Sequence, residues 1–510
     1  MSPEVIASLV AIWVVMLLPA ATLVGTDIGS MLAAALLGAV LVSWAAEAEL
    51  FIGGSFQLWL VVLALCANAL ALAAWLTRRH PSLTGCQSAV VSRPVRRQTF
   101  RLHAWARWSS IGPLTSYALP LLVATTLPIL LLGAKYVTHD ANAIWILHAR
   151  WILAGHQAYL SSLHNPAYSF SNPSYPPLIS AVMALPGVVS PGPTALDAVS
   201  VVAMLNGVAL GLVALALLKL ASSTSAVQSS ASLLSVIVVL FGFGADGIYS
   251  AGGDADLFWA ACAVAGVLFG LVLPQSRNHL AIALVCFLAA SLSKSEASVA
   301  ATATVALVAW RYATLRPQGR FGHGRSRLAE LARASVSRKH FRQHLPICAL
   351  WIPAVLGMSG LGWLFAMHAL GVPNRFFEPP LSGQSLSYRV ATASVALAPY
   401  LPLVAAAAAS DLFATLRWRS WRAQVGLGSP LLLWIVVALY MVGLLTTYAI
   451  GSLPIVGWLG SSLSRAMIFV QLAVASEIAA SSILVGRLLR GGEEERMGGV
   501  KGSGIRSTRQ

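Results

Sequence analysis

Residues 138–151 read Thr-His-Asp-Ala-Asn-Ala-Ile-Trp-Ile-Leu-His-Ala-Arg-Trp, a polar stretch that directly follows the apolar segment 114–134. The pattern predicts an amphipathic helix from Ala141 to Ala154, with Asp140 at its start. One interpretation of Asp140 is a helix cap beside a membrane surface, where Trp145 and Trp151 act as interfacial anchors. The other interpretation is a functional acid. The side of the membrane on which this stretch lies determines the side on which each of the other loops lies.

The composition predicts an integral membrane protein. Of the 510 residues, 57% are hydrophobic and only 10% are charged, whereas soluble domains carry about 25% charged residues. The apolar segments are continuous rather than alternating, which favours helices over a barrel. The fold class is therefore an all-α polytopic membrane protein. The net charge of +16 fits Lys and Arg gathered in cytoplasmic loops, so we expect membrane lipids as partners and no nucleic acid.

The apolar segments predict about thirteen transmembrane helices, since each needs about 20 apolar residues. Residues 174–190 are apolar but short and contain three prolines, so we expect them to lie along the membrane surface. The N-terminus is then outside, and the C-terminus and the basic loops are cytoplasmic. The predicted spans are 4–25, 31–49, 56–76, 114–134, 196–221, 230–250, 256–273, 279–293, 296–311, 346–369, 391–416, 429–449 and 464–487.

These spans divide the chain into six regions. Residues 1–77 form a three-span anchor, and 78–113 form a basic cytoplasmic loop. Residues 114–311 form a core with the large outer loop 135–195, which should carry interfacial helices. A second basic cytoplasmic loop covers 312–345, further spans cover 346–490, and the Gly-rich and Ser-rich tail 491–510 is expected to be disordered.

Two groups of charged residues in the core are candidates for the same outer site. Asp254 and Asp256 follow two glycines and open a span. They either stabilise a helix N-terminus or orient an acceptor substrate or a bound cation. Lys294 and Glu296 separate two spans with almost no loop. They either neutralise each other or bind phosphate.

The remaining candidates are spread along the outer face. Tyr175 lies in a Tyr-Pro-Pro-Leu turn, which is either a helix start or a ligand contact. Arg375 and Arg389 lie in a later outer loop and suit phosphate, although a salt-bridged loop is the alternative. Arg150 is a further outer cation. The spacing of the histidines at 139, 148, 156 and 164 matches no compact metal-ligand motif, so no metal ligands are assigned.

The order of these motifs resembles the GT-C superfamily of polyprenyl-phosphate-sugar-dependent glycosyltransferases, especially members related to protein mannosyltransferases and lipid A aminoarabinose transferases. The resemblance covers residues 114–311. It implies a lipid-linked sugar donor, a glycan, lipid or protein acceptor, and a catalytic acid at Asp140. Many relatives have adjacent acids here, whereas Asp140 is followed by Ala141. This departure leaves the need for Mg²⁺ or Mn²⁺ open.

The resemblance implies a mechanism with inversion at the sugar. Asp140 acts as the base that takes the acceptor proton. Asp256, with Asp254 as second choice, orients the acceptor or a cation, and Lys294, Arg375 and Arg389 stabilise the leaving phosphate. Tyr175, Glu296 and Arg150 complete the predicted substrate contacts. The alternative is a transporter or lipid flippase, for which we expect internal repeats and charges in the middle of spans.

Overall fold

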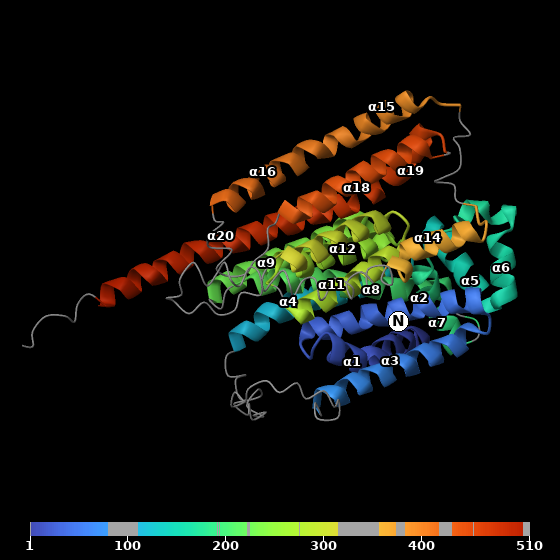
Figure 1. Ribbon diagram of the computed structural model, residues 1–510, viewed down its shortest axis with the longest axis horizontal. Coiled ribbons are helices and arrows are strands. Elements are labelled where there is room, and N and C mark those ends of the chain that lie inside the picture. The colour runs from blue at the N-terminus through green and yellow to red at the C-terminus, as the bar shows by residue number, and fades with distance from the viewer. Residues whose placement is uncertain are drawn as a thin grey trace, which may run out of the picture.

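The protein is an elongated bundle of helices that run mostly along one axis (Figure 1). The computed structural model describes residues 2–79, 111–314 except for 191, 193, 222–224 and 275, 356–373, 383–417, and 431–502 except for 452. Within these residues every regular element is a helix and there is no strand. The basic segments 80–110 and 315–355 lie outside the described residues, and so does Arg375.

Eight helical segments of the described chain are long and apolar enough to cross a membrane. Each of the thirteen predicted spans contains a helix, but five of these helices are short or only partly described. The membrane class is therefore supported, and the count of thirteen is not confirmed. The eight segments are α1 (Pro3–Leu23), α2 (Ile28–Ile52), α3 (Phe56–Arg79), α8 (Ala195–Leu220), α9 (Ser225–Asp246), α15 (Leu386–Leu397) with α16 (Leu401–Arg417), α18 (Leu431–Ile450), and α19 (Ile455–Ala466) with α20 (Ile468–Gly502).

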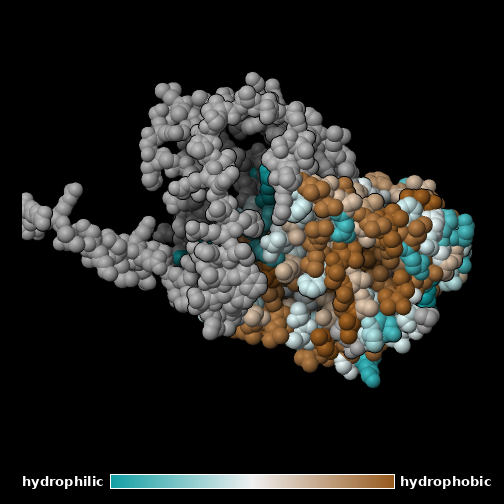
Figure 2. Space-filling view, turned by 90° about the horizontal axis from the view of Figure 1, so that it is seen from below, coloured by the Kyte–Doolittle hydropathy of each residue, from teal (hydrophilic) through white to brown (hydrophobic). Residues whose placement is uncertain are grey.

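The other helices complete the bundle. They are α4 (Ile111–Leu132), α10 (Asp256–Val267) with the π-helix η6 (Leu268–Val272), α11 (Arg277–Ser293), α12 (Ala297–Thr314) and α14 (Gly360–Ala369). Helix α10 is buried along its whole length, whereas α3 exposes most of its apolar side chains. Figure 2 shows this apolar surface along the bundle, with hydrophilic residues gathered at one end.

Local sequence explains where several helices begin. The Ser2 hydroxyl accepts a hydrogen bond from the backbone N–H of Val5, with proline at the first helical position of α1. Asp27 caps α2 in the same way, 2.9 Å from the N–H of Ser30. Thr194 and Asp197 cap each other's backbone at the start of α8. Each cap satisfies a backbone donor that the first helical turn leaves without an internal partner.

The two ends of the bundle differ in charge. At one end, here called the basic end, Lys219 pairs with Asp27 at 2.7 Å. Arg311 donates to the carbonyls that end η6, and Arg487 lies 3.4 Å from the carbonyl of Leu220. The opposite end, here called the acidic end, carries the loop that follows α4. It includes the short helices α5 (Leu147–Ala154), α6 (His156–Leu163) and α7 (Leu178–Val189) (Figure 1).

The first outer loop differs from the helix predicted for Ala141 to Ala154. Residues Ala141–Ile146 form a π-helix, η3, and only then does α5 begin. Asp140 does not cap this segment, because its backbone is already helical and its side chain makes no capping hydrogen bond. Gly155, at φ +93°, ends α5 and allows the chain to turn directly into α6.

The proline-containing segment 174–190 is packed inside the protein rather than lying exposed on a surface. It forms α7, whose twelve residues span about 18 Å, less than the roughly 30 Å hydrocarbon core of a bilayer. Residues 178–186 are all buried, and α7 packs against α2, α5 and α8. The apolar side chains that predicted membrane contact therefore contact protein.

The last helix extends into the segment predicted as a tail. Helix α20 continues from Ile468 to Gly502, beyond the boundary predicted at residue 490. The sequence Arg-Leu-Leu-Arg at 487–490 and the glutamates at 493–495 are strong helix formers, and they continue the helix across the glycine pair at 491–492. Residues 503–510 lie outside the described part of the chain.

Candidate functional site

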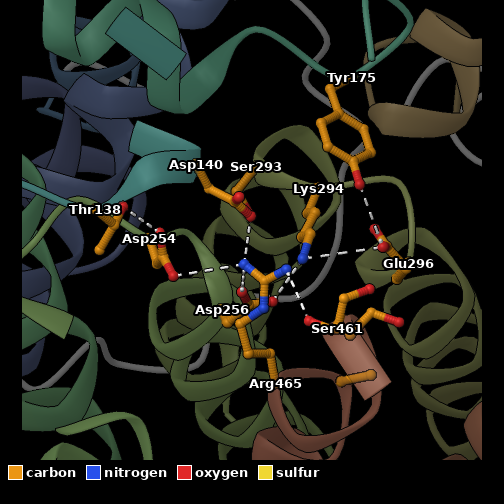
Figure 3. Close-up of polar contacts among 12 residues, drawn as sticks. Thr138, Asp140, Tyr175, Asp254, Asp256, Ser293, Lys294, Glu296, Ser461 and Arg465 are labelled. Atoms are coloured by element: carbon orange, nitrogen blue, oxygen red, sulfur yellow. Dashed lines mark hydrogen bonds and ion pairs between the residues drawn. The ribbon is translucent and has the colours of Figure 1, made fainter. Parts of the chain in front are cut away.

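Six charged residues from four separate segments meet at the acidic end (Figure 3). Asp140 precedes η3, and Asp254 and Asp256 lie between the 3-10 helix η5 (Gly247–Ser250) and α10. The turn between α11 and α12 supplies two more, and the last turn of α19 supplies the sixth. We call this group the charged cluster, and its members are Asp140, Asp254, Asp256, Lys294, Glu296 and Arg465.

Thr138 joins the first two of these segments. Its backbone N–H donates to the carbonyl of Gly252 at 3.0 Å, and its hydroxyl donates to Asp254 Oδ1 at 2.6 Å. The same hydroxyl oxygen accepts the N–H of Ala141 at 2.9 Å. Between these contacts Gly253 has φ +96°, and a Cβ there would come within 2.9 Å of Ala141. Only glycine permits this approach, so the glycine pair explains how Asp140 and Asp254 become neighbours.

Arg465 is the centre of the charged cluster. Its Nη1 contacts Asp140 Oδ2 in a close ion pair and lies 3.5 Å from Asp254 Oδ2 and 3.9 Å from Asp256 Oδ2. The sequence placed Arg465 on the outer face without assigning it a role. One feature of the sequence could have identified Arg465, because it is the single charged residue in an otherwise uncharged stretch. That stretch is 325 residues from Asp140.

Lys294 forms the second half of the cluster. Its Nζ lies 2.6 Å from Asp256 Oδ1 and 3.9 Å from Glu296 Oε1. The Tyr175 hydroxyl reaches Glu296 Oε1 at 3.5 Å, and the Tyr175 ring stacks on Trp145 with a centroid distance of 5.3 Å. The turn after α11 and the Tyr-Pro-Pro-Leu segment therefore face the same site, as their predicted roles require.

The electrostatics of the cluster follow from burial and from an excess of acids. Burial and the neighbouring Asp256 raise the pKa of Asp254 to about 6, and they outweigh the hydrogen bond from Thr138 and the charge of Arg465. Burial alone would lower the pKa of Lys294. Asp256 and Glu296 outweigh that effect and hold the pKa of Lys294 well above its usual range. Lys294 is therefore a fixed cation, whereas Asp254 titrates near neutrality.

Of the three predicted arginines, the structure describes Arg389 and Arg150. Arg389 is fully buried and donates to the backbone carbonyls of Tyr448, Ala449 and Leu453 at 2.8–3.2 Å. It thereby ties α15 to the end of α18 and to the segment before α19. Arg150 is exposed on α5 and makes no ion pair with a described residue. The loop with Arg375 lies outside the described residues.

The histidines of the first outer loop have structural contacts. His148 is buried beside Ser171 at 3.1 Å, and burial lowers its pKa to about 3. The Nδ1 of His156 faces the carbonyl of Glu49 at 2.9 Å. His164 lies between two backbone carbonyls, and these two contacts raise its pKa. These rings pack the loop against α2 and α14.

The described residues do not fit Mg²⁺ or Mn²⁺ as they are arranged. No three His, Cys, Asp or Glu side chains among them are placed to hold one metal ion. The carboxylates of Asp140, Asp254 and Asp256 all face the guanidinium of Arg465. This guanidinium lies where a shared metal would have to bind.

A small cavity adjoins the cluster. Its walls combine Asp256, Lys294 and Glu296 with aromatic rings of α10, α18 and α19. Its volume of about 20 Å³ has room for roughly one water molecule. A sugar or a phosphate therefore requires side chains to move. The aromatic residues that line it are Trp259, Tyr440, Tyr448 and Trp458.

A second, larger cavity of about 500 Å³ lies between α16 and α20 and is lined by Asp411 and Glu477. Both acids are buried. Ser481 donates to Asp411 Oδ1 at 2.6 Å and lies 3.2 Å from Glu477 Oε1, and the indole of Trp434 donates to Asp411 Oδ2 at 2.5 Å. We call these acids the α16–α20 pair. Both acids lie within predicted spans, 391–416 and 464–487, in which the sequence singled out no candidate for the site, because hydropathy averages hide isolated acids in long apolar helices.

Comparison with known proteins gives no match: no protein-family model, no curated protein and no solved structure matches this chain. The functional argument therefore depends on the geometry of the charged cluster and on its place at one end of an apolar bundle.

Proposed function

We propose that this protein is a membrane glycosyltransferase of the GT-C type, which transfers a sugar from a polyprenyl-phosphate donor to an acceptor outside the cytoplasm. The observation that carries the proposal is the charged cluster itself. It combines a partly exposed carboxylate with two cations, Lys294 and Arg465, at one end of an apolar bundle. Such a pairing of an acid with cations suits proton removal beside a leaving phosphate.

In the proposed reaction Asp140 is the base. Arg465 engages its Oδ2, and no described residue donates a hydrogen bond to its Oδ1, which is left for the acceptor hydroxyl. The acceptor oxygen attacks the anomeric carbon as its proton passes to Asp140. The bond from that carbon to the phosphate oxygen breaks, and the electron pair leaves with the phosphate. Attack from the face opposite the phosphate inverts the sugar.

The cations have separate parts in this scheme. Lys294 is held by Asp256 at 2.6 Å and provides a fixed positive charge for the phosphate. Arg465 pairs with the proposed base in the ligand-free protein. An entering phosphate competes with Asp140 for Arg465, so binding of the donor releases the carboxylate that accepts the proton.

The proposed topology has thirteen crossings, with the N-terminus outside and the C-terminus in the cytoplasm of a cell membrane. Lys219, Arg311 and Arg487 gather at the basic end, opposite the charged cluster. This asymmetry supports a cytoplasmic basic end under the positive-inside rule. The charged cluster is then on the outer face, where lipid-linked donors and exported acceptors meet.

The first test is turnover by the purified protein. Incubation with polyprenyl-phosphate sugars should release polyprenyl phosphate, and Asp140→Asn should reduce the rate about 10²- to 10⁴-fold, as expected for loss of a general base. Asp197→Asn is the matched control, because Asp197 caps α8 away from the cluster and asparagine is also a good cap. Full activity of Asp140→Asn would refute the assignment of the base.

A second candidate function, a transporter or flippase, is favoured by one observation. The α16–α20 pair lies beside a cavity, with Glu477 inside the candidate span Ile455–Arg487 and Asp411 just after the candidate span Leu386–Ala409. Buried acids within membrane spans often mark transport pathways. Reconstituted protein that moves a solute or lipid without releasing polyprenyl phosphate would favour this candidate. In that case Glu477→Gln should abolish activity and Asp140→Asn should not.

A further inference from the structure

The charged cluster contains more acids than cations. Among the described residues, the cations that face Asp140, Asp254, Asp256 and Glu296 are Arg465 and Lys294. This set has an excess of two negative charges when all its groups are ionised. A fifth carboxyl, Asp246 at the end of α9, has no hydrogen-bond partner among the described residues and adds to the excess of acids. An anionic ligand entering this site meets repulsion that the two cations cannot offset.

We propose that the cluster binds its anionic ligand together with one proton, and that Asp254 takes this proton. This inference rests on the proposed function in one respect, namely that the ligand is a phosphodiester. It adds a coupled proton, which nothing in the transfer reaction requires. The protonated carboxyl also offers an O–H donor to the ligand where a carboxylate would repel it.

Asp254 is the cluster acid that combines deep burial with the lack of a close ion pair. Asp140 has its own close ion pair with Arg465, and Asp256 has Lys294 at 2.6 Å. Asp254 is 2% exposed, and its nearest cation is 3.5 Å away. Glu296 lies 3.9 Å from Lys294, but its side chain is 20% exposed, so it is less deeply buried than Asp254. Burial without a close cation favours the uncharged acid.

The groups that face Asp254 come from every element packed around it. Thr138 contributes a neutral hydroxyl from the segment before η3, and Asp140 contributes a negative charge from the same segment. Asp256 at the start of α10 and Asp246 at the end of α9 are further acids. In the part of the chain that the structure describes, the cation that faces Asp254 is Arg465 of α19. A ligand that draws Arg465 toward itself therefore leaves Asp254 among acids only.

The sign of the pH dependence follows from this arrangement. The pKa of Asp254 is about 6 in the ligand-free protein, and a bound anion raises it further. Above about pH 6 the free site has lost the proton that the complex needs. The apparent affinity should then fall about tenfold per pH unit, until the pKa of the complex is reached. Below about pH 6 the affinity should be constant.

The experiment is calorimetric titration of the purified full chain in detergent with farnesyl methyl phosphate, a diester whose single charge is constant over this range. Binding is measured from about pH 6 to about pH 8.5. Titrations at about pH 7.5 in two buffers of different ionisation enthalpy count the protons taken up. We expect about one proton per ligand and an apparent Kd that rises about tenfold per pH unit.

Two variants test whether Asp254 is the residue that takes up the proton. Asp254→Asn keeps an oxygen for the Thr138 hydroxyl, and it should bind the diester with a flat pH profile and more tightly than the wild type at high pH. Glu296→Gln removes one charge from the same cluster and should keep the slope. The proton count of the wild type requires no variant, so it tests the coupling even if Asp254→Asn folds poorly.

The outcomes separate this inference from the proposed function. Wild-type binding with no proton uptake would overturn the coupling and leave the proposed transferase standing. A slope that persists in Asp254→Asn would show that another group takes the proton. If the wild type fails to bind the diester at every pH, the anion site itself is refuted, and the proposed function is refuted with it.

Discussion

Two regions of the molecule bury acids in opposite ways. In the charged cluster, Asp256 lies 2.6 Å from Lys294 and Asp140 is paired with Arg465. In the α16–α20 pair, the two oxygens of Asp411 accept hydrogen bonds from the Ser481 hydroxyl and the Trp434 indole, which are both neutral donors. The first region balances charge with charge, whereas the carboxylate of Asp411 is held by neutral donors.

The difference determines which ligand each region can respond to. An anion entering the charged cluster finds two cations that can exchange a carboxylate for it, so that region can bind a phosphate and change its internal pairs. The donors that hold Asp411 are neutral, so neither of them is a cation that could be transferred to an anion, and the carboxylate itself suits a cation or a proton. This contrast is the physical reason for preferring the charged cluster as the transferase site.

The largest expected effect comes from removing Lys294. Lys294→Gln leaves Asp256 buried without its close cation, and breaking a buried ion pair by removing one partner costs about 3–5 kcal/mol. The double variant with Asp256→Asn should recover most of this stability, because no uncompensated charge remains, yet it should stay inactive. Thermal unfolding of the purified protein, with the rate of polyprenyl phosphate release, measures both effects.

The matched control is the other lysine pair of similar length. Lys219 and Asp27 are 2.7 Å apart, but their side chains are 22% and 44% exposed. Lys219→Gln should cost at most about 1 kcal/mol, because water solvates the remaining charge. If Lys294→Gln and Lys219→Gln lost the same stability, burial would not distinguish the ion pair at the acidic end from the one at the basic end. Lys294 would then not be a preorganised cation.

Arg465 provides the next largest effect, on rate. Arg465→Gln removes the cation that faces three carboxylates and should reduce turnover about 10²- to 10³-fold, as is typical for loss of one group that stabilises developing charge. Arg465→Lys should recover part of the rate, since a lysine keeps the charge without the planar fork. If Arg465→Gln turned over at the wild-type rate, Arg465 would not be needed, and Lys294 would be the cluster cation that binds the phosphate.

Much of this arrangement could be predicted from the sequence, because its signals are local. Continuous hydropathy predicts the helices, and Asp254, Asp256, Lys294 and Glu296 all stand at the ends of apolar segments, which places them at one end of the bundle. Arg465 could not be predicted, because its partner Asp140 is 325 residues away. The burial of α7 also could not be predicted from the sequence, because an apolar segment has the same composition whether it contacts lipid or protein.

The smallest expected effect on turnover tests the second region. The single hydroxyl hydrogen of Ser481 can be donated to only one of the two acids that its oxygen contacts. Ser481→Ala removes that donor and should cost about 1–3 kcal/mol, the usual penalty for a buried acceptor left without its partner. Thermal unfolding measures this loss, and polyprenyl phosphate release should stay at the wild-type rate, because the α16–α20 pair takes no part in the proposed transfer. A rate that fell together with stability would show that the two regions act as one site, and the contrast between anion-binding and cation-binding acids would have to be abandoned.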